Sequence, residues 1–581
     1  MKAGSESVRV GLAQINPTVG DLEGNVRAIQ RSITGARKLG IQILAFPEFV
    51  LCGYPPEDLL LKPRFLSDCE KALRSLAKSA RGIAVIVGAP EPPAGRGKRP
   101  YNTAYLLYRG HIAARYRKIH LPNYGVFDEK RYFEAGKDPV VVRFGGYAVG
   151  LQICEDIWAD DGPMASQVCG AGARLVINIS ASPYNRRKGP EREKLMQRRA
   201  RENGAWLCYI NLLGGQDELV FDGSSVIVSP MGKTVARAAP FKEDLVVADI
   251  KLSSRAPKGR RMRKGNLHPV TTINLPPLRS PAARPPLARR RRKHLEPAEE
   301  IYEALLMGTR DYVDKNGFTG VVLGLSGGVD SALSAVIAVD ALGAGRVTGV
   351  TMPSAFTSRE TLQDARLLAE ALRIRLTEIP IDPIYRAYIE SLEGEFAGRT
   401  EDATEENIQA RIRGNILMAL SNKFGCLVLT IGNKSEVAVG YCTLYGDMAG
   451  GFAILKDVPK TLVYRLSRYR NRIGSSPVIP PATIRRKPTA ELKPGQLDQD
   501  ILPPYPMLDR IIELYVERDM SLGEIVRKGL DRKAVQQTIR MIDANEYKRR
   551  QAPPGIKITP KAFGRDRRLP ITNRYPGAGG R

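Results

Sequence analysis

The chain has 581 residues, which is too long for one compact domain and predicts two to four. Its hydrophobic fraction of 43% is ordinary for a protein with buried cores, and no apolar run is long enough to predict a transmembrane helix. The formal net charge of +28 would suit anionic partners, so its distribution along the chain matters more than its size.

The seven cysteines are scattered, odd in number and free of any C-x-x-C pair. This pattern argues against a disulfide framework and against a structural zinc site. The first residues, MKAGSESVRV, also lack the apolar stretch of a secretory signal. We therefore expect a cytoplasmic protein whose cysteines are free thiols.

Residues 1–250 alternate short apolar runs with helical patterns, which predicts a layered α/β sandwich rather than a repeated βαβ sheet. The predicted strands are 8–15, 41–48, 83–90, 104–108, 147–154, 174–180, 206–214 and 224–230.

Three chemically distinct side chains lie at or near the ends of predicted strands in this half: Glu48, Lys118 and Cys154. Taken singly, each has an ordinary explanation as a strand-end charge, a solvated cation or a core thiol. Taken together, they supply what thiol chemistry needs. A carboxylate can remove the thiol proton, and a cation can stabilise the oxyanion formed when the thiolate attacks a carbonyl.

Residues 251–295 carry fourteen Lys and Arg residues and no Asp or Glu, which is half of the net charge. The stretch is also rich in proline. Such a composition cannot build a packed core and predicts a linker or an extended surface segment.

From residue 296 onward, helical patterns alternate regularly with the apolar runs 320–326, 346–354, 375–382 and 426–436. This alternation predicts a doubly wound parallel sheet.

The segment LGLSGGVDSALS, residues 323–334, joins an apolar strand to a helix through a glycine-rich turn. Glycines let the backbone approach an anion closely, and the first turn of a helix offers free N–H groups. The hydroxyls of Ser326 and Ser331 add donors, and Asp330 is a suitable ligand for Mg²⁺. The segment predicts a pyrophosphate cradle, although it lacks the Walker lysine pattern.

This segment resembles the PP-loop of the N-type ATP pyrophosphatases, and two further segments resemble the NAD synthetase signature: 406–452, containing GNKSE, and 546–558, EYKRRQAPPGIKI. The resemblance implies that Asn407, Glu436 and Lys548 contact deamido-NAD, that Glu436 joins Asp330 at Mg²⁺, and that Lys434 helps to stabilise charge. The threonine that usually precedes GNKSE is replaced by Ile431, so we expect Thr430 or the backbone to make that contact. The implied ATP-binding residues are Gly324, Leu325, Ser326, Gly327, Gly328, Val329, Asp330, Ser331, Thr430 and Ile431.

The first half resembles the nitrilases, whose Glu–Lys–Cys triad matches Glu48, Lys118 and Cys154 in order and flanking residues. The segment HLPNYGVFDEKRYFEAG, residues 120–136, is similar to the glutaminase loop of the NAD synthetases. The resemblance implies that Tyr124 binds glutamine and that Glu129 orients Lys118. It also implies that Ser182 and Lys188, in SASPYNRRKG, contact the α-amino acid end of the substrate.

Together the resemblances imply a nitrilase-like α-β-β-α sandwich over 1–250, a basic linker over 251–295, and a PP-loop synthetase domain with a substrate-binding C-terminal tail over 296–581. They imply that ammonia released from glutamine amidates deamido-NAD through an adenylate, with ATP and Mg²⁺. They also imply a homo-oligomer with an intersubunit ammonia channel.

Two alternatives remain open at this point. The first is another PP-loop ligase fused to an amidohydrolase, which the nitrilase-like half disfavours. The second is a nucleic-acid-binding protein, suggested by the charge, although no recognised module with interleaved aromatic residues is present. We expect neither nucleic acid nor a membrane as a partner.

Overall fold

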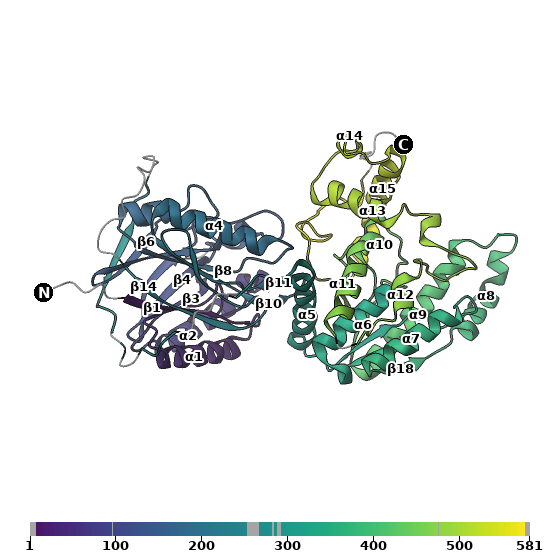
Figure 1. Cartoon of the computed structure of the whole chain (residues 1–581), viewed down its shortest axis with the longest axis horizontal. Helices are drawn as coiled ribbons and strands as arrows, with labels where there is room; N and C mark the ends of the chain where they lie inside the picture. The colour runs from purple at the N-terminus through teal and green to yellow at the C-terminus, as the bar shows by residue number, and fades with distance from the viewer. Residues whose placement is uncertain are drawn as a thin grey trace. The chain divides into compact units, whose positions relative to one another are not determined.

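The computed structural model describes residues 7–93, 95, 97–252, 267–279, 281, 284–287, 292–474, 476–573 and 575 (Figure 1). The chain divides into two compact units. One comprises residues 1–216 and 220–295, and the other comprises 217–219 and 296–581. In the described part of the chain, no helix combines the length and apolar character needed to cross a membrane.

The first unit is built on two large sheets. Across the first sheet, the order is β14 (Asp244–Lys251), β1 (Ser7–Gln14), β2 (Ile43–Ala45), β3 (Ala84–Glu91), β4 (Tyr101–Tyr108) and β5 (His111–Arg117). Across the second sheet, it is β13 (Thr234–Arg237), β12 (Val226–Val228), β9 (Trp206–Asn211), β8 (Leu175–Ser180), β7 (Tyr147–Ile153), β6 (Val140–Phe144) and β15 (Thr271–Leu275). Strands β10 (Leu213–Gln216) and β11 (Leu219–Asp222) form a separate hairpin.

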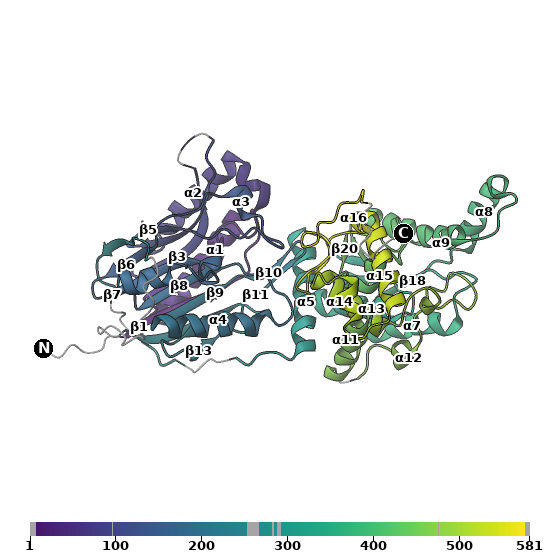
Figure 2. The same ribbon diagram turned by 90° about the horizontal axis from the view of Figure 1, so that it is seen from above.

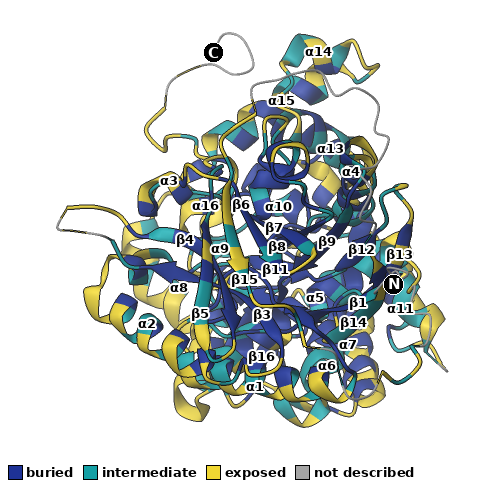
Figure 3. Cartoon of the chain, turned by 90° about the vertical axis from the view of Figure 1, so that its left-hand side faces the viewer, coloured by how far each residue is buried: buried dark blue, intermediate teal, exposed yellow. Residues whose placement is uncertain are grey.

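Helices cover the outer faces of these two sheets, which pack against each other through their inner faces. One core cluster joins Val10 and Ile86 of the first sheet to Leu151 and Ile177 of the second. Helices α1 (Leu22–Lys38) and α2 (Pro63–Ala77) pack on the first sheet, and α4 (Lys188–Asn203) packs on the second. Figure 3 shows the central strands as almost wholly buried. Because both faces of each sheet are covered, central strands such as β3 and β8 are buried along their whole length, and the predicted α-β-β-α sandwich is confirmed.

The basic stretch 251–295 adds a strand to the first unit where it is described. Strand β15 runs parallel to β6, with Ile273 and Leu275 packed against the core between the sheets. Further along, the carbonyl oxygens of Pro277 and Pro285 accept hydrogen bonds from first-sheet side chains. The sequence predicted only a linker or an extended segment there. Residues 253–266, 280, 282, 283 and 288–291 of the stretch lie outside the described residues.

The second unit contains one five-stranded parallel sheet. Its order is β18 (Arg375–Glu378), β17 (Val347–Thr351), β16 (Val321–Gly324), β19 (Leu427–Thr430) and β20 (Phe452–Ala453). The order runs backward from β18 to β16 and then jumps to β19. This reversal is the switch point of a doubly wound sheet, where a crevice opens at the carboxyl ends of the strands. The predicted parallel, doubly wound sheet is confirmed.

Helices pack on this sheet and continue beyond it. Helix α9 lies against β16 and β19, α6 lies against β16 and β17, and Figure 2 shows α8 beside α9. Apolar side chains of α8 and α9 form a common core with the strands, including Ile408 and Ile412 of α9 and Val322 of β16. The helices from α5 to α11 are α5 (Pro297–Lys315), α6 (Val329–Leu342), α7 (Arg359–Leu372), α8 (Asp382–Phe396), α9 (Ala403–Phe424), α10 (Lys434–Val439) and α11 (Lys460–Ile473). The remaining helices are α12 (Pro481–Arg485), α13 (Tyr505–Ile512), α14 (Leu522–Val526), α15 (Arg532–Ala544) and α16 (Glu546–Gln551).

Candidate functional site

The three candidate catalytic side chains of the first unit are all buried, although they come from three different strand ends. Glu48 follows β2, Lys118 follows β5 and Cys154 follows β7. Their exposed fractions are only 1%, 1% and 3%. A buried charge is costly unless it is paired with an opposite charge. The contacts of Lys118 and Glu48 therefore show how these two charges are accommodated in the interior.

The Lys118 ammonium joins two carboxylates. Its Nζ lies 2.9 Å from Oε1 of Glu48 and 2.8 Å from Oε1 of Glu129. Glu48 is fixed further by the amide of Asn102 at 2.7 Å and by the backbone N–H of Ala181 at 2.8 Å. The second oxygen of Glu129 is buried and accepts no hydrogen bond from the described residues. The arrangement therefore holds the ammonium rigidly and leaves one carboxylate oxygen available.

Burial and mutual repulsion set the proton affinities of this cluster. Burial raises the pKa of Glu129 to about 7, and the charge of Glu48 adds to that rise against the opposing effect of Lys118. Burial alone would lower the pKa of Lys118, but Glu129 and Glu48 outweigh it and hold that pKa well above the ordinary value. Burial, followed by the negative charge of Glu48, raises the pKa of the Cys154 thiol. The thiol therefore needs a base to lose its proton. The Glu48 carboxylate is the candidate, because it lies close enough to Cys154 for its charge to affect the thiol.

Cys154 occupies a sharp turn between β7 and a short 3₁₀ helix, Cys154–Ile157. Its φ is 39°, in the left-handed region that costs a side-chain-bearing residue about 1 kcal/mol or more. Strain of this kind is common where a reactive side chain has to be presented at a strand end.

Of the four residues predicted to contact glutamine, Glu129 contacts a triad side chain directly and Tyr124 contacts the residue after Cys154. Glu129 begins α3 (Glu129–Tyr132) and contacts Lys118 directly. Tyr124 is 58% exposed, and its hydroxyl donates to the carboxylate of Glu155, the residue after Cys154. Ser182 is buried and donates its N–H to Asn211. Lys188 begins α4, and its ammonium lies 5.9 Å from the centre of the Trp158 ring.

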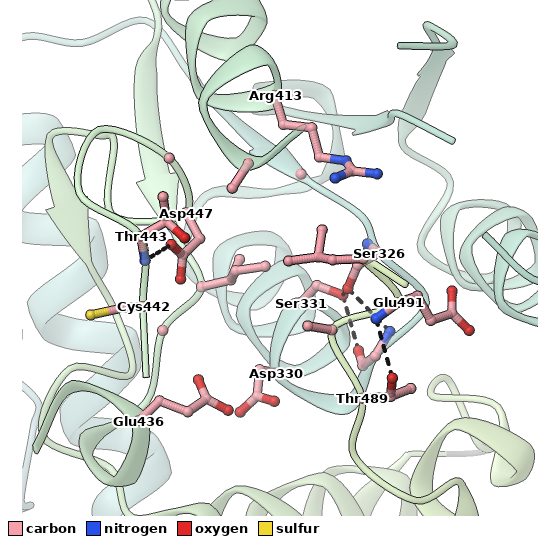
Figure 4. Close-up of a pocket in the computed structure, with 18 of the residues that line it drawn as sticks. Ser326, Asp330, Ser331, Arg413, Glu436, Cys442, Thr443, Asp447, Thr489 and Glu491 are labelled. Atoms are coloured by element: carbon pink, nitrogen blue, oxygen red, sulfur yellow. Dashed lines mark hydrogen bonds between the residues drawn. The ribbon is translucent and has the colours of Figure 1, made fainter. Parts of the chain in front are cut away.

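In the second unit, the glycine-rich turn follows β16 at the switch point of the sheet. Gly327 has a φ of 75°, and a side chain there would meet the carbonyl oxygen of Thr361 at 2.2 Å. Ser331 Oγ lies 2.9 Å from the Gly328 carbonyl oxygen and 3.2 Å from Ser326 Oγ (Figure 4). Helix α6 begins at Val329, so the turn delivers a helix N-terminus to the crevice.

A cavity of about 500 Å³ occupies this crevice. All the residues predicted to bind ATP, deamido-NAD or metal line this cavity, namely Gly324, Leu325, Ser326, Gly327, Gly328, Val329, Asp330, Ser331, Asn407, Thr430, Ile431, Glu436 and Lys548. They come from segments more than 200 residues apart in the chain. Thr430 and Ile431 both line the cavity. Although Ile431 stands where the resemblance expects threonine, the hydroxyl of Thr430 is therefore still available at the cavity wall.

Asp330 and Glu436 face each other across the cavity wall (Figure 4). Lys460 links them, with its Nζ 2.5 Å from Asp330 Oδ2 and 3.0 Å from Glu436 Oε1. Burial raises the pKa of Glu436 to about 7, with Lys460 opposing and Asp330 adding to the rise. Among the described residues, no cluster of three or more His, Cys, Asp or Glu side chains could hold a metal. Two carboxylates nevertheless fit Mg²⁺, which usually takes one or two of them and completes its shell with phosphate and water oxygens.

Asn407, which precedes α10 in the chain, and Lys548, which follows it, both contact the loop after α10. Asn407 Oδ1 accepts from the Thr443 hydroxyl at 2.7 Å. Lys548 Nζ donates to the carbonyl oxygens of Gly440 and Cys442 at 2.7 and 2.9 Å. The C-terminal segment therefore closes one side of the cavity.

The prediction for Lys434 is wrong. Its ammonium is fully buried away from the cavity, where it pairs with Asp457 and Glu517 and donates to the Thr559 hydroxyl. Its role is to hold the C-terminal segment against α10.

Lys460 is a functional candidate that sequence reasoning missed. It begins α11 and lies in KDVPK, outside the segments that carried the resemblance. Arg413 and Arg486 also line the cavity and were not singled out. In the sequence, each of these arginines is only a cation in a helical or loop segment, and such residues are usually exposed to solvent.

Comparison with known proteins adds to this geometry. Residues 9–258 match the carbon–nitrogen hydrolase family model, and residues 301–552 match the NAD synthase model. The chain is 48% identical to the glutamine-dependent NAD(+) synthetase of Thermotoga maritima, covering 98% of this chain and 99% of the relative. It is 49% identical to the enzyme of that name from Aquifex aeolicus, covering 97% and 99%.

A solved structure of glutamine-dependent NAD+ synthetase from Acinetobacter baumannii, in complex with ADP, is also similar. It shares 39% sequence identity and a TM-score of 0.74, with 98% of this chain and 99% of that chain covered.

Proposed function

The chain belongs to the glutamine-dependent NAD(+) synthetases, and we propose that its two units divide the reaction between the sites described above. Residues 1–250 form the glutamine amidohydrolase domain, and residues 296–581 form the PP-loop synthetase domain. The reaction is the ATP-dependent amidation of deamido-NAD, and its products are NAD, AMP, pyrophosphate and glutamate.

In the first unit, Cys154 is the nucleophile. Glu48 takes the thiol proton, and the thiolate adds to the γ-carbonyl carbon of glutamine. Lys118 and the backbone N–H of Glu155 stabilise the oxyanion. The protonated Glu48 then gives its proton to the leaving amide nitrogen, so that ammonia departs and the thioester forms, and water hydrolyses the thioester to glutamate and regenerates the thiol. The buried, doubly paired ammonium of Lys118 supports this assignment, because it is already oriented before substrate arrives.

Four residues hold glutamine in this scheme. Tyr124 and Glu129 lie near the reacting end, and Ser182 and Lys188 contact the α-amino acid end. The free, buried oxygen of Glu129 supports its role, since an unpaired acceptor there suits the amide N–H₂ of the substrate.

In the second unit, the carboxylate of deamido-NAD attacks the α-phosphorus of ATP and displaces pyrophosphate. Ammonia then displaces AMP from the adenylate. The turn Ser326–Ser331 and the N-terminus of α6 bind the phosphates, and Thr430 or the backbone of Ile431 contacts ATP. Mg²⁺ held by Asp330 and Glu436 would neutralise phosphate charge when bound. Lys460, which pairs with both carboxylates, contributes positive charge at the same place, and Asn407, Glu436 and Lys548 bind deamido-NAD.

We propose further that the enzyme is a cytoplasmic homo-oligomer in which an intersubunit channel carries the ammonia. Free ammonia is mostly protonated at neutral pH and is then a poor nucleophile, which makes internal delivery advantageous. The basic charge is incidental to this function, so glutamine hydrolysis should persist at high salt, where phosphate-dominated nucleic-acid binding would fail.

The single observation that carries the proposal is that all the residues predicted to contact ATP, deamido-NAD or Mg²⁺ line one cavity of the second unit. The test is NAD formation from deamido-NAD, ATP and Mg²⁺ with glutamine or ammonium as donor, in wild type and Cys154→Ala. Wild type should use both donors, and the variant should use ammonium alone. Equal loss of both reactions in a folded variant would contradict the division. Absence of NAD with either donor in wild type would mean that the second unit activates another acid.

A further inference from the structure

Asp156 is a buried carboxylate that the reaction scheme does not use. It lies two residues after Cys154 and is 1% exposed. Its neighbours are four hydrogen-bond donors from two different strand ends. A buried carboxylate with this many donors is held in one position, and it holds its donors in turn.

On the β5 side, the donors bracket Lys118. The Tyr116 hydroxyl donates to Oδ2 of Asp156 at 2.7 Å. The backbone N–H groups of Ile119 and His120 donate to Oδ1 at 3.2 and 2.9 Å. Donors therefore lie both before and after Lys118, which fixes the path of the backbone that carries its ammonium.

On the β7 side, the donor is the backbone N–H of Ile153, which lies 3.1 Å from Oδ2. Ile153 immediately precedes Cys154, whose φ of 39° is an unfavourable conformation. The hydrogen bond from Ile153 to Asp156 closes the turn around Cys154 and so keeps Cys154 from relaxing to an ordinary backbone conformation.

We propose that Asp156 is a positioning residue for glutamine hydrolysis, clamping the backbone beside Lys118 to the backbone beside Cys154. The inference rests on the proposed glutaminase function and deepens it. Within the described residues, the Lys118 ammonium donates to Glu48 and Glu129, and no hydrogen bond joins it to Cys154. Asp156 instead joins the backbone that carries the ammonium to the backbone that carries the thiol.

The clamp needs a carboxylate and not merely a polar side chain. Ionised aspartate offers two acceptor oxygens and no donor, which suits three backbone N–H groups and one hydroxyl. Asparagine has the same shape but would aim an N–H₂ group at one set of these donors. Burial raises the pKa of Asp156, and the hydrogen bonds from His120, Tyr116 and Ile153 work against that rise.

The test compares Asp156→Asn and Asp156→Glu with wild type, measuring glutamate release from glutamine. Both variants should lower kcat by about 100-fold with KM changed less than about twofold, because the reacting groups are displaced while the substrate contacts remain. Asp156→Glu keeps the charge and moves the oxygens by one methylene, so it tests position even if Asp156→Asn fails to fold. Ammonium-dependent NAD formation should be unchanged in both.

Asp249→Asn is the matched control, because Asp249 makes a bidentate pair with the buried Arg9 in the same unit. It should lower thermal stability without changing kcat. The inference is overturned if a folded Asp156 variant keeps kcat within about threefold of wild type, or if its KM rises as much as its kcat falls. Failure of the proposed function looks different, because wild type would then release no glutamate or Cys154→Ala would still release it.

Discussion

At the scale of single residues, the position of Glu48 depends on a neighbour that has no side chain. Gly88 in β3 lies so close to the segment that follows β2 that an added Cβ would sit 2.4 Å from the Phe49 nitrogen and 2.8 Å from the Glu48 Cα. Both contacts are with backbone, which cannot rotate away. The candidate base is therefore placed by packing between strands as much as by its own sequence.

We predict that Gly88→Ala lowers kcat for glutamine hydrolysis by about 100-fold, because the backbone of Glu48 has to shift. Gly146→Ala in the same unit is the control, since a Cβ there meets nothing within 4 Å. Steady-state glutaminase assays on both variants check the prediction. Wild-type kcat in a folded Gly88→Ala protein would contradict it.

Glu129 gives a prediction about pH. Burial raises its pKa to about 7, so it is largely neutral below that pH and ionised above it. The ionised form balances the charge of Lys118, and the neutral form does so less well. Below pH 7, kcat/KM for glutamine should therefore fall toward about tenfold per pH unit. Glu129→Gln cannot titrate, so its activity should be low and should lack this acid limb. A limb near pH 7 that survives in Glu129→Gln would assign it to another group.

The two lysines of the synthetase unit show how residue type alone misleads. Lys434 lies in the quoted motif but is buried among Asp457 and Glu517. Lys460 lies outside that motif yet bridges Asp330 and Glu436. A lysine side chain is long and flexible, so it can reach either the cavity or the protein interior from its helix. The position of its carboxylate partners decides which of the two it does.

At the scale of elements, β15 shows that the basic stretch is more than a connection. Its five residues pair with β6, and Ile273 and Leu275 share the face that packs on the core. The alternation was short and was surrounded by proline and arginine, so composition masked it.

We predict that Ile273→Ala with Leu275→Ala lowers the free energy of unfolding of the first unit by about 2 kcal/mol, since both side chains are only partly buried. Asn274→Ala, on the exposed face between them, should change it by less than about 0.5 kcal/mol. Urea unfolding followed by circular dichroism measures both. Equal, negligible effects would mean that the segment behaves as a free linker in solution.

At the scale of the whole molecule, a single substitution in one unit should abolish the activity of that unit and leave the activity of the other intact. Asp330→Asn removes a charge from the nucleotide cavity, and we predict that NAD formation falls by about 100-fold or more with either donor. Glutamine hydrolysis by the first unit should persist. The control is Asp314→Asn, which removes an exposed ion pair with Arg346 in the same unit. Normal ammonium-dependent synthesis by Asp330→Asn would contradict the role given to the carboxylate.

The sequence alone predicted the two sheet architectures, because apolar periodicity and the spacing of turns are local properties. It also offered candidate residues for both sites from recognisable motifs, and several of these residues lie at strand ends. The strand-end positions of Glu48, Lys118 and Cys154 are examples.

Only the tertiary structure decided which side chains meet. The contacts of Asp156 with the β5 end and of Lys460 with Asp330 and Glu436 depend on strand order and on how the segments between them pack. A hydrogen bond is formed or lost within a few tenths of an ångström, and sequence periodicity fixes no distance between segments far apart in the chain.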